Sequence, residues 1–301
     1  MVSSRPDAGP AAPVPFPPLV ELLRRLGVRL QKSKGQHYLR DREVCVRIAG
    51  LAAEADGGSF GAVEVGAGIG NLTVELARDA ETVRAVELEE RFREWHEYLA
   101  TAYGPIRFLY GDFLKFSWGE LTGGAGARLP WVGVGNLPYQ LTSDILFRFL
   151  EAPVPFRRLV FMVQREVAER ICAEPGARRA GALTYKIALQ YEARYELTIP
   201  PEAFLPPPKV HSAVIVLDAR REVLYADGAA RARLHRFVDR LFQYRRKTLG
   251  NAMAMGQLAP DRAAAEALLD RCGIDARRRP ETLTLDELIR LAAAGGEARE
   301  K

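Results

Sequence analysis

A proline turn in the middle of the chain carries groups that suit a flat ring bearing an amino group. Residues 135–139 read Gly-Asn-Leu-Pro-Tyr. Pro138 fixes its own φ, lacks an N–H and pushes Leu137 towards an extended conformation. The Leu137 carbonyl and the Asn136 side chain can then both accept hydrogen bonds beside the aromatic face of Tyr139. The turn therefore favours a planar base, with one alternative: a turn that ends a buried strand and places Tyr139 in the core.

A glycine loop follows an acid earlier in the chain. Glu64 stands two residues before Gly66, which alternates with Gly68 and Gly70, and these glycines allow a backbone to approach a ligand closely. A dinucleotide-binding fingerprint would need glycine or alanine at position 71, where the chain has Asn71. An acid so placed would repel a pyrophosphate but can favour the cationic end of S-adenosylmethionine. The loop thus disfavours an NAD-dependent oxidoreductase, for which we also find no hydride-transfer constellation.

Two further acids end predicted strands. Glu87 lies 21 positions after Gly66, where a carboxylate can accept both hydroxyls of a ribose. Asp112 follows the next predicted strand, where a carboxylate can accept from an adenine amino group. The alternative is that both acids only cap the helices that follow them.

These groups need an α/β fold to bring them together. We predict strands at 62–65, 82–86, 106–110, 131–134 and 159–163, later strands at 195–199 and 210–217, and helices at 18–26, 41–55, 71–77, 89–102 and 165–173. Alternating strands and helices predict a parallel sheet with helices on both faces. Ligands bind beyond the carboxyl ends of such strands, so the loop, both acids and the turn should share one edge.

The chain divides into three predicted regions. Residues 1–18 contain six prolines and no apolar core of a signal peptide, so we expect a disordered tail. We expect a Rossmann-like domain at 19–221. The strand pattern ends near residue 222, and predicted helices at 229–244, 261–272 and 285–294 indicate a small helical domain at 222–301.

Composition limits the protein class. Hydrophobic residues make up 48% and charged residues 27% of 301 residues, as in ordinary globular proteins, and no apolar stretch reaches the length of a membrane span. Cys45, Cys172 and Cys272 form no CxxC pair, which excludes the usual zinc frameworks. We therefore expect no bound metal, no membrane association and a reducing cytoplasm.

Basic residues are clustered. The net charge is +5, and residues 231–247 hold seven Lys/Arg against one acid, Asp239. A second cluster lies at 24–34. Such clusters are typical of proteins that bind a polyanion, because neutralised phosphates release counterions. The alternative is a solvated arginine-rich face.

The ordered motifs resemble the ribosomal RNA adenine dimethyltransferase family. They are Gly-Gln-His-Tyr-Leu at 35–39, Glu-Val-Gly-Ala-Gly-Ile-Gly at 64–70, Glu87, Gly-Asp at 111–112, Asn-Leu-Pro-Tyr at 136–139, Gln-Arg-Glu at 164–166, Phe-x-Pro-Pro-Pro-Lys-Val-x-Ser at 204–212 and Arg-Arg-Lys-Thr at 245–248. The resemblance implies a Rossmann-like methyltransferase domain. It also implies S-adenosylmethionine as methyl donor, S-adenosylhomocysteine as product, and two methyl transfers to each target adenine's exocyclic amine.

The substrate is implied by two of these motifs. Asn-Leu-Pro-Tyr and Arg-Arg-Lys-Thr look most like the enzymes that act on two adjacent adenosines near the 3′ end of small-subunit rRNA, with a role in small-subunit biogenesis. One alternative is the erythromycin-resistance type, which acts on large-subunit rRNA. Another is a non-catalytic ribosome assembly factor. The expected partner is small-subunit rRNA or the assembling subunit, and the protein is expected to be a monomer.

The resemblance also implies roles for particular residues. The catalytic set would be Asn136, Leu137, Pro138 and Tyr139, with Phe204 as a second aromatic wall. The cofactor would be bound by Gln36, His37, Leu39, Glu64, Gly66, Gly68, Gly70, Glu87, Leu88, Gly111, Asp112, Phe113 and Asn136. RNA would be bound by Lys32, Lys34, Arg245, Arg246 and Lys247.

One position departs from the bacterial pattern of the family. Bacterial members usually have an asparagine that contacts the cofactor where this chain has His37. Archaeal and eukaryotic relatives tend to have histidine at this position. A cationic imidazole would oppose the sulfonium, so we expect a neutral His37. The other histidines (His96, His211 and His235) are expected to be structural or at the surface.

Overall fold

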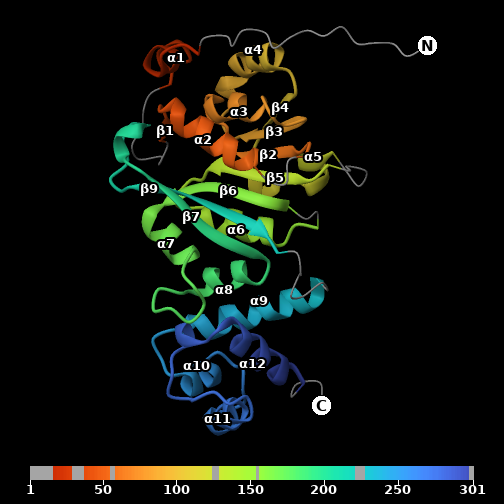
Figure 1. Ribbon diagram of the computed structural model, residues 1–301, viewed down its shortest axis with the longest axis vertical. Coiled ribbons are helices and arrows are strands. Elements are labelled where there is room, and N and C mark those ends of the chain that lie inside the picture. Colours follow the sequence, from red (N-terminus) through yellow and green to blue (C-terminus); the bar gives the residue numbers. More distant parts are fainter. Residues whose placement is uncertain are drawn as a thin grey trace, which may run out of the picture.

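A seven-stranded sheet forms the centre of the protein (Figure 1). The computed structural model describes residues 16–28, 37–54, 58–123, 129–153, 156–220 and 228–297. The strand order is β4-β3-β2-β5-β6-β9-β7. The pairs from β4 to β6 are parallel, whereas β9 runs antiparallel to both β6 and β7. The predicted α/β, Rossmann-like sheet is confirmed.

The strands begin and end close to the predicted positions. They are β2 (Gly61–Val65), β3 (Thr82–Glu87), β4 (Ile106–Tyr110), β5 (Trp131–Asn136), β6 (Phe156–Gln164), β7 (Tyr191–Ile199) and β9 (Ser212–Ala219). The order reverses between β2 and β5, which are neighbours in the sheet although β3 and β4 separate them in the chain. Ligands of doubly wound sheets bind at such a switch point.

Alternating side chains divide the interior into two cores, one on each face of the sheet. Along β6, Val160 and Met162 pack into one core, and Leu159, Phe161 and Val163 into the other. The first core is covered by α2 (Arg42–Ala53), α3 (Asn71–Leu76) and α4 (Arg93–Tyr103), and the second by α5 (Trp118–Thr122), α6 (Thr142–Leu150) and α7 (Arg165–Ile171). The period of two along a strand thus builds both layers.

Helix ends follow local capping chemistry. The Asp41 side chain accepts a hydrogen bond from the Glu43 N–H and caps the N-terminus of α2. The predicted helix at 89–102 is split into a 3-10 turn, η2 (Glu90–Phe92), and α4. Short α5 was not predicted, and it begins with a capping box between Ser117 and Glu120.

A small second sheet joins distant parts of the chain. β1 (Tyr38–Leu39) pairs antiparallel with β8 (Phe204–Leu205), with Tyr38 opposite Leu205 and Leu39 opposite Phe204. Neither strand was predicted, because each has only two residues. The pairing fixes the segment before α2 against the proline-rich stretch after β7.

The last part of the described chain is helical. It contains α9 (Gly228–Gln243), α10 (Leu249–Met255), α11 (Arg262–Arg271) and α12 (Leu285–Glu297), which lie at the end of the molecule opposite α1 (Leu19–Arg25) and α4 (Figure 1). Their core also takes in Tyr185 and Leu189 from the neighbourhood of α8 (Ala182–Ala188), a helix that was not predicted. The boundary that we predicted at residue 222 falls outside the described residues, and the two-domain division stays a proposal.

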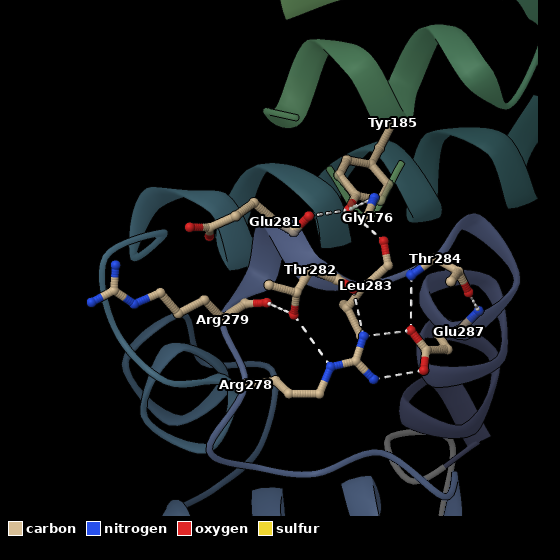
Figure 2. Close-up of polar contacts among 9 residues, drawn as sticks. All are labelled: Gly176, Tyr185, Arg278, Arg279, Glu281, Thr282, Leu283, Thr284 and Glu287. Carbon is tan, nitrogen blue, oxygen red and sulfur yellow. Dashed lines mark hydrogen bonds and ion pairs between the residues drawn. The ribbon is translucent and has the colours of Figure 1, made fainter. Parts of the chain in front are cut away.

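A buried tyrosine connects the helical end to the rest of the protein (Figure 2). The Tyr185 hydroxyl lies 2.5 Å from the Leu283 carbonyl oxygen and 3.0 Å from that of Glu281, and it accepts from the Gly176 N–H at 3.1 Å. Next to this contact, the Arg278 guanidinium forms a two-pronged ion pair with Glu287. One hydroxyl therefore satisfies polar groups from two segments that are about a hundred residues apart.

Replacing Tyr185 with phenylalanine should destabilise the protein by about 1–3 kcal/mol, because buried backbone groups would lose their partner. Tyr195→Phe is the matched control, since Thr198 is the one hydrogen-bond partner of its hydroxyl among the described residues and the pair is exposed. That change should cost less than about 0.5 kcal/mol. Urea unfolding of both variants measures the difference, and equal stabilities would contradict a role for the Tyr185 hydroxyl.

Candidate active site

A cavity of about 480 Å³ opens at the carboxyl ends of the parallel strands. It lies where β2, β3, β4 and β5 end, at the switch point of the sheet. Twelve of the residues predicted for the site line it: His37, Gly66, Gly68, Glu87, Leu88, Gly111, Asp112, Phe113, Asn136, Leu137, Pro138 and Tyr139. The structure therefore brings the glycine loop, both strand-terminal acids and the proline turn to one cavity.

The glycine loop is fixed by backbone contacts and by Glu87. The N–H groups of Gly66 and Ala67 both donate to the Val86 carbonyl, at 2.9 and 3.0 Å. The Glu87 carboxylate accepts from the Gly68 N–H at 2.7 Å and from the Glu89 N–H at 2.9 Å. Gly68 has a φ of +57°, a conformation that favours glycine.

Glu87 is an acceptor in a largely dry place. Burial raises the pKa of its carboxyl, and the N–H groups of Glu89 and Gly68 oppose that shift because they favour the charged form. Each carboxylate oxygen accepts one of these bonds and keeps a further lone pair. Glu87 can therefore accept ligand hydroxyls while it holds the loop.

Asp112 is both a cap and a cavity residue. One of its carboxylate oxygens accepts from the Leu114 N–H at 3.0 Å and caps the 3-10 turn η3 (Phe113–Lys115). Asp112 is therefore an N-cap, as one interpretation of the sequence predicted, but it uses one oxygen for this and also lines the cavity. Leu88 also lines it with 69% of its surface exposed, and Phe113 lines it from a buried position. These two apolar side chains suit a flat ring.

The proline turn presents two acceptors. The Asn136 side-chain N–H donates to the His37 carbonyl at 3.1 Å, which assigns Oδ1 as the atom left to accept. The Leu137 N–H donates to the Met162 carbonyl, whereas no described residue donates to the Leu137 carbonyl oxygen. A Cβ added to Gly66 would lie 3.8 Å from the Asn136 carbonyl oxygen, so the loop and the turn are neighbours.

The aromatic ring of the turn is held from two sides. The Tyr139 hydroxyl lies 2.7 Å from the Ser212 hydroxyl at the start of β9. The His37 ring stacks loosely against it, with centroids 6.1 Å apart and planes inclined by 28°. The His37 Nδ1 lies 2.7 Å from the Pro206 carbonyl, which can only accept, so Nδ1 carries a proton.

Four predicted residues are not on the cavity wall. Leu39 is buried, and its carbonyl accepts from the Asn71 side chain at 2.7 Å. Gly70 is the last residue of the loop and the N-cap of α3, and a Cβ added to it would lie 2.5 Å from the Leu99 side chain. Phe204 is 1% exposed and packs in the core, paired with Leu39, instead of forming a second aromatic wall. Glu64 lies within β2.

Glu64 lies beneath the cavity. It is 1% exposed, and burial raises the pKa of its carboxyl to about 7, with the negative charge of Glu87 adding to the shift. One of its carboxylate oxygens has no hydrogen-bond partner among the described residues. Glu64 could therefore act on a ligand in the cavity only through its electrostatic field or through a bridging water molecule.

Sequence reasoning missed several wall residues. They are Tyr38, Val65, Val86, Phe92, Leu114, Gln140, Leu141, Ile145 and Gln164. Tyr38 enters the site through β1, and Gln164 ends β6 beside the turn. The sequence signal for Gln164 was its place at the end of a predicted strand, as for Glu87 and Asp112. The predicted Gln36, Lys32 and Lys34 lie outside the described residues.

The charge of the cavity is informative. No lysine or arginine is among the described residues that line it, whereas Glu87 and Asp112 are. A pyrophosphate would find no cation there, whereas a cationic ligand would be favoured. Within the described ranges, no group of three or more His, Cys, Asp or Glu side chains could hold a metal ion, and no helix is long and apolar enough to cross a membrane.

Three basic residues, Arg245, Arg246 and Lys247, follow the end of α9. The chain enters α9 at one side and leaves it at the side where β9 begins with Ser212 (Figure 1). Arg246 and Lys247 are exposed and form no ion pair with a described residue. Arg245 differs, because its guanidinium donates to the Arg178 carbonyl and lies 3.8 Å from Glu281.

Solved structures share this architecture. A dimethyladenosine transferase from Plasmodium falciparum superposes with a TM-score of 0.72 at 21% identity, over 87% of this chain and 98% of that one. The 23S rRNA methyltransferase ErmE superposes with a TM-score of 0.65 at 27% identity, over 86% and 99%. The fold and the cavity define the chain as a Rossmann-like methyltransferase.

Sequence comparisons define the family. The profile of the ribosomal RNA adenine dimethylase family matches residues 27–293. The chain belongs to this family. It is 36% identical to the ribosomal RNA small subunit methyltransferase A of Geobacter sulfurreducens, over 91% of this chain and 99% of the relative. It is 41% identical to the protein of the same name from an Anaeromyxobacter species (strain K), over 90% and 95%.

Proposed function

We propose that this protein uses S-adenosylmethionine to dimethylate the exocyclic amines of two adjacent adenosines near the 3′ end of small-subunit rRNA. The observation that carries the proposal is the Asn136 amide. Its N–H donates to the His37 carbonyl, which leaves Oδ1 to accept, and the carbonyl of the next residue, Leu137, accepts from no described residue. An adenine amine has two N–H groups to donate to such a pair of acceptors.

The cavity has the groups needed to hold the methyl donor. When bound, S-adenosylmethionine supplies an electrophilic methyl group on a sulfonium. Glu87 would accept the ribose hydroxyls, and Asp112 the amino group of the donor's adenine. Leu88 and Phe113 would contact that ring, and the backbone at Gly66 and Gly68 would approach the rest of the molecule. The absence of lysine and arginine from the described wall fits a cationic donor.

The turn residues address a difficulty in the chemistry. The lone pair of an adenine amine is delocalised into the ring, so the amine is a poor nucleophile. Acceptors at Asn136 Oδ1 and the Leu137 carbonyl would favour a pyramidal nitrogen and stabilise the charge that develops on it. The proton becomes acidic only as the N–C bond forms, so no strong base is required.

The target base needs a surface to lie on. The Tyr139 ring, fixed by Ser212 and flanked by His37, offers one face for stacking. Stacking of one base on an aromatic ring contributes on the order of 1–3 kcal/mol, which helps to hold an adenine turned out of its helix. Stacking on Tyr139 would fix the plane of the base, and the two acceptors would fix its amine. Together they would place the amine in line with the methyl group on the sulfonium.

The choice of small-subunit rRNA rests on the relatives. The curated relatives cited above carry small-subunit names at 36% and 41% identity, whereas the 23S rRNA methyltransferase is 27% identical. Large-subunit rRNA is therefore the second candidate. The measurement is methyl transfer onto unmethylated small subunits, with large-subunit rRNA in parallel, and primer extension to locate the product. Methylation of the large-subunit RNA alone would overturn the choice.

Reversing the charges of Arg246 and Lys247 should weaken binding to the small subunit and flatten its salt dependence. Each lost phosphate contact reduces the slope of log K against log salt by about one. Arg245 is left unchanged, because its contacts with Arg178 and Glu281 would mix stability with binding. The matched control reverses Arg271 and Arg279, which are exposed and form no ion pair with a described residue, and it changes the net charge equally.

The measurement is filter binding of both double variants to small subunits at several salt concentrations. The expected result is a flatter slope for the Arg246/Lys247 variant alone. An unchanged slope, or the same loss in the Arg271/Arg279 control, would remove Arg246 and Lys247 from the RNA surface.

A further inference from the structure

Two neighbouring residues of α4, Trp95 and His96, form hydrogen bonds with the glycine loop. The Trp95 indole N–H donates to the Ile69 carbonyl at 2.9 Å. The His96 Nε2 lies 2.9 Å from the Gly68 carbonyl oxygen. Two consecutive carbonyls of the loop are therefore bonded by two consecutive side chains of one helix. Of the two loop residues, Gly68 lines the cavity.

The tautomer of His96 follows from its partners. A carbonyl oxygen can only accept, so Nε2 carries the proton that is shared with Gly68. The side chain is fully buried, and burial lowers the pKa of His96 to about 4, which leaves the ring neutral. Nδ1 then accepts from the Tyr110 hydroxyl, 3.0 Å away. The Phe108 ring stacks on the imidazole, with centroids 3.9 Å apart and planes inclined by 8°.

Glu87 and His96 bind the two backbone polar groups of Gly68. The Gly68 N–H donates to the Glu87 carboxylate at 2.7 Å, while its carbonyl accepts from His96. A trans peptide places its C=O and N–H on opposite edges, so the following Ile69 N–H is turned away from His96. No described residue accepts from that N–H. The loop thus keeps one unpaired donor, with the neighbouring Gly68 on the cavity wall.

We propose that His96 is a positioning residue for the methyl donor. Through its bond to the Gly68 carbonyl it holds the loop at 66–70 in the conformation that Glu87 and the cavity require. Tyr110 selects the tautomer of His96 that can make this bond. The inference rests on the proposed function, because S-adenosylmethionine is the ligand that the loop is taken to bind. His96 itself touches no ligand, since it does not line the cavity.

The test compares three single variants with the unmodified protein. His96→Leu removes the bond to Gly68, and His96→Gln keeps an amide N–H that can replace Nε2–H. His235→Leu is the matched control, because His235 is also a buried histidine but lies in the core around α9. Titration calorimetry gives the dissociation constant for S-adenosylmethionine. Methyl transfer at saturating donor gives kcat, and hydrogen exchange reports on the amides at 66–70 without any ligand.

His96→Leu should raise the dissociation constant on the order of tenfold, as expected for one lost buried hydrogen bond, and leave kcat at saturating donor within about twofold. Its loop amides should exchange faster. His96→Gln should restore most of the affinity, and His235→Leu should change neither affinity nor loop exchange, even if it lowers the melting temperature.

The inference is overturned if folded His96→Leu binds the donor as tightly as the unmodified protein and exchanges its loop amides no faster. It is also overturned if His96→Gln is as weak as His96→Leu, or if His235→Leu weakens binding equally. If the unmodified protein fails to bind the donor, the proposed function is wrong and His96 has no role in donor binding; loop exchange that still depends on His96 would then support only its hold on the loop at 66–70.

Discussion

Replacing Asn136 with alanine should lower the rate of methyl transfer by roughly 10²–10³-fold, the usual cost of removing one preorganised group that stabilises developing charge. The change deletes Oδ1, one of the two acceptors assigned to the turn, and it also releases the His37 carbonyl from the Asn136 N–H. Affinity for S-adenosylmethionine should change far less than the rate. Single-turnover methyl transfer at saturating donor, together with calorimetric binding, separates the two effects.

Asn251→Ala makes the same chemical change on α10, away from the cavity, and should preserve both quantities. Melting temperatures of the two variants show whether the Asn136 variant remains folded. Equal losses of rate and donor affinity in Asn136→Ala would show instead that Asn136 is chiefly a cofactor ligand.

The second large effect is expected at Glu87. Glu87→Ala should weaken donor binding by roughly 10²–10⁴-fold, because each hydrogen bond to a charged group contributes about 1.5–3 kcal/mol and two ribose hydroxyls would lose their acceptor. The Gly68 and Glu89 N–H groups would lose theirs as well, so the loop would also loosen. Equilibrium dialysis with labelled S-adenosylmethionine measures the loss, with NAD as a parallel ligand.

Two further variants separate the loss of the Glu87 acceptor from a general loss of stability. Glu87→Gln keeps one acceptor oxygen and should fall between alanine and the native residue. Glu75→Ala removes another buried acid, which lies on α3 and pairs with Arg42 and Arg78, and should reduce stability without a comparable loss of affinity. A Glu87→Ala protein that binds the donor within about threefold of the native affinity would contradict the assignment.

Periodicity predicted the strands, and strand-terminal residues predicted Glu87, Asp112 and the turn at one edge, whereas His37, Leu88 and Phe113 on the cavity wall were implied by the family resemblance. The predicted strand at 106–110 agrees with β4 at both ends, and Glu87, Asp112 and the turn at 136–139 lie together as expected for the carboxyl edge of a parallel sheet. These features can be predicted from short stretches of sequence. A short apolar run indicates a buried strand, and a polar residue directly after it lies at the carboxyl end of that strand, where ligands bind.

The sequence could not show contacts made by very short or distant elements. β1 and β8 have two residues each, too few for a periodic pattern, although their pairing buries Phe204 instead of exposing it to the cavity. The direction of β9 also depends on tertiary packing. His96 was expected to be structural, and only the structure shows that it reaches back to Gly68, 28 positions earlier.

The account depends on one arrangement: a donor pocket that opens onto the two acceptors of the turn at 136–139. A crystal structure with bound S-adenosylmethionine tests it most directly. We predict the ribose hydroxyls on Glu87 and the methyl group directed towards Asn136 Oδ1 and the Leu137 carbonyl. A methyl group that points away from this turn, or a donor bound elsewhere because the cavity is closed, would contradict the account.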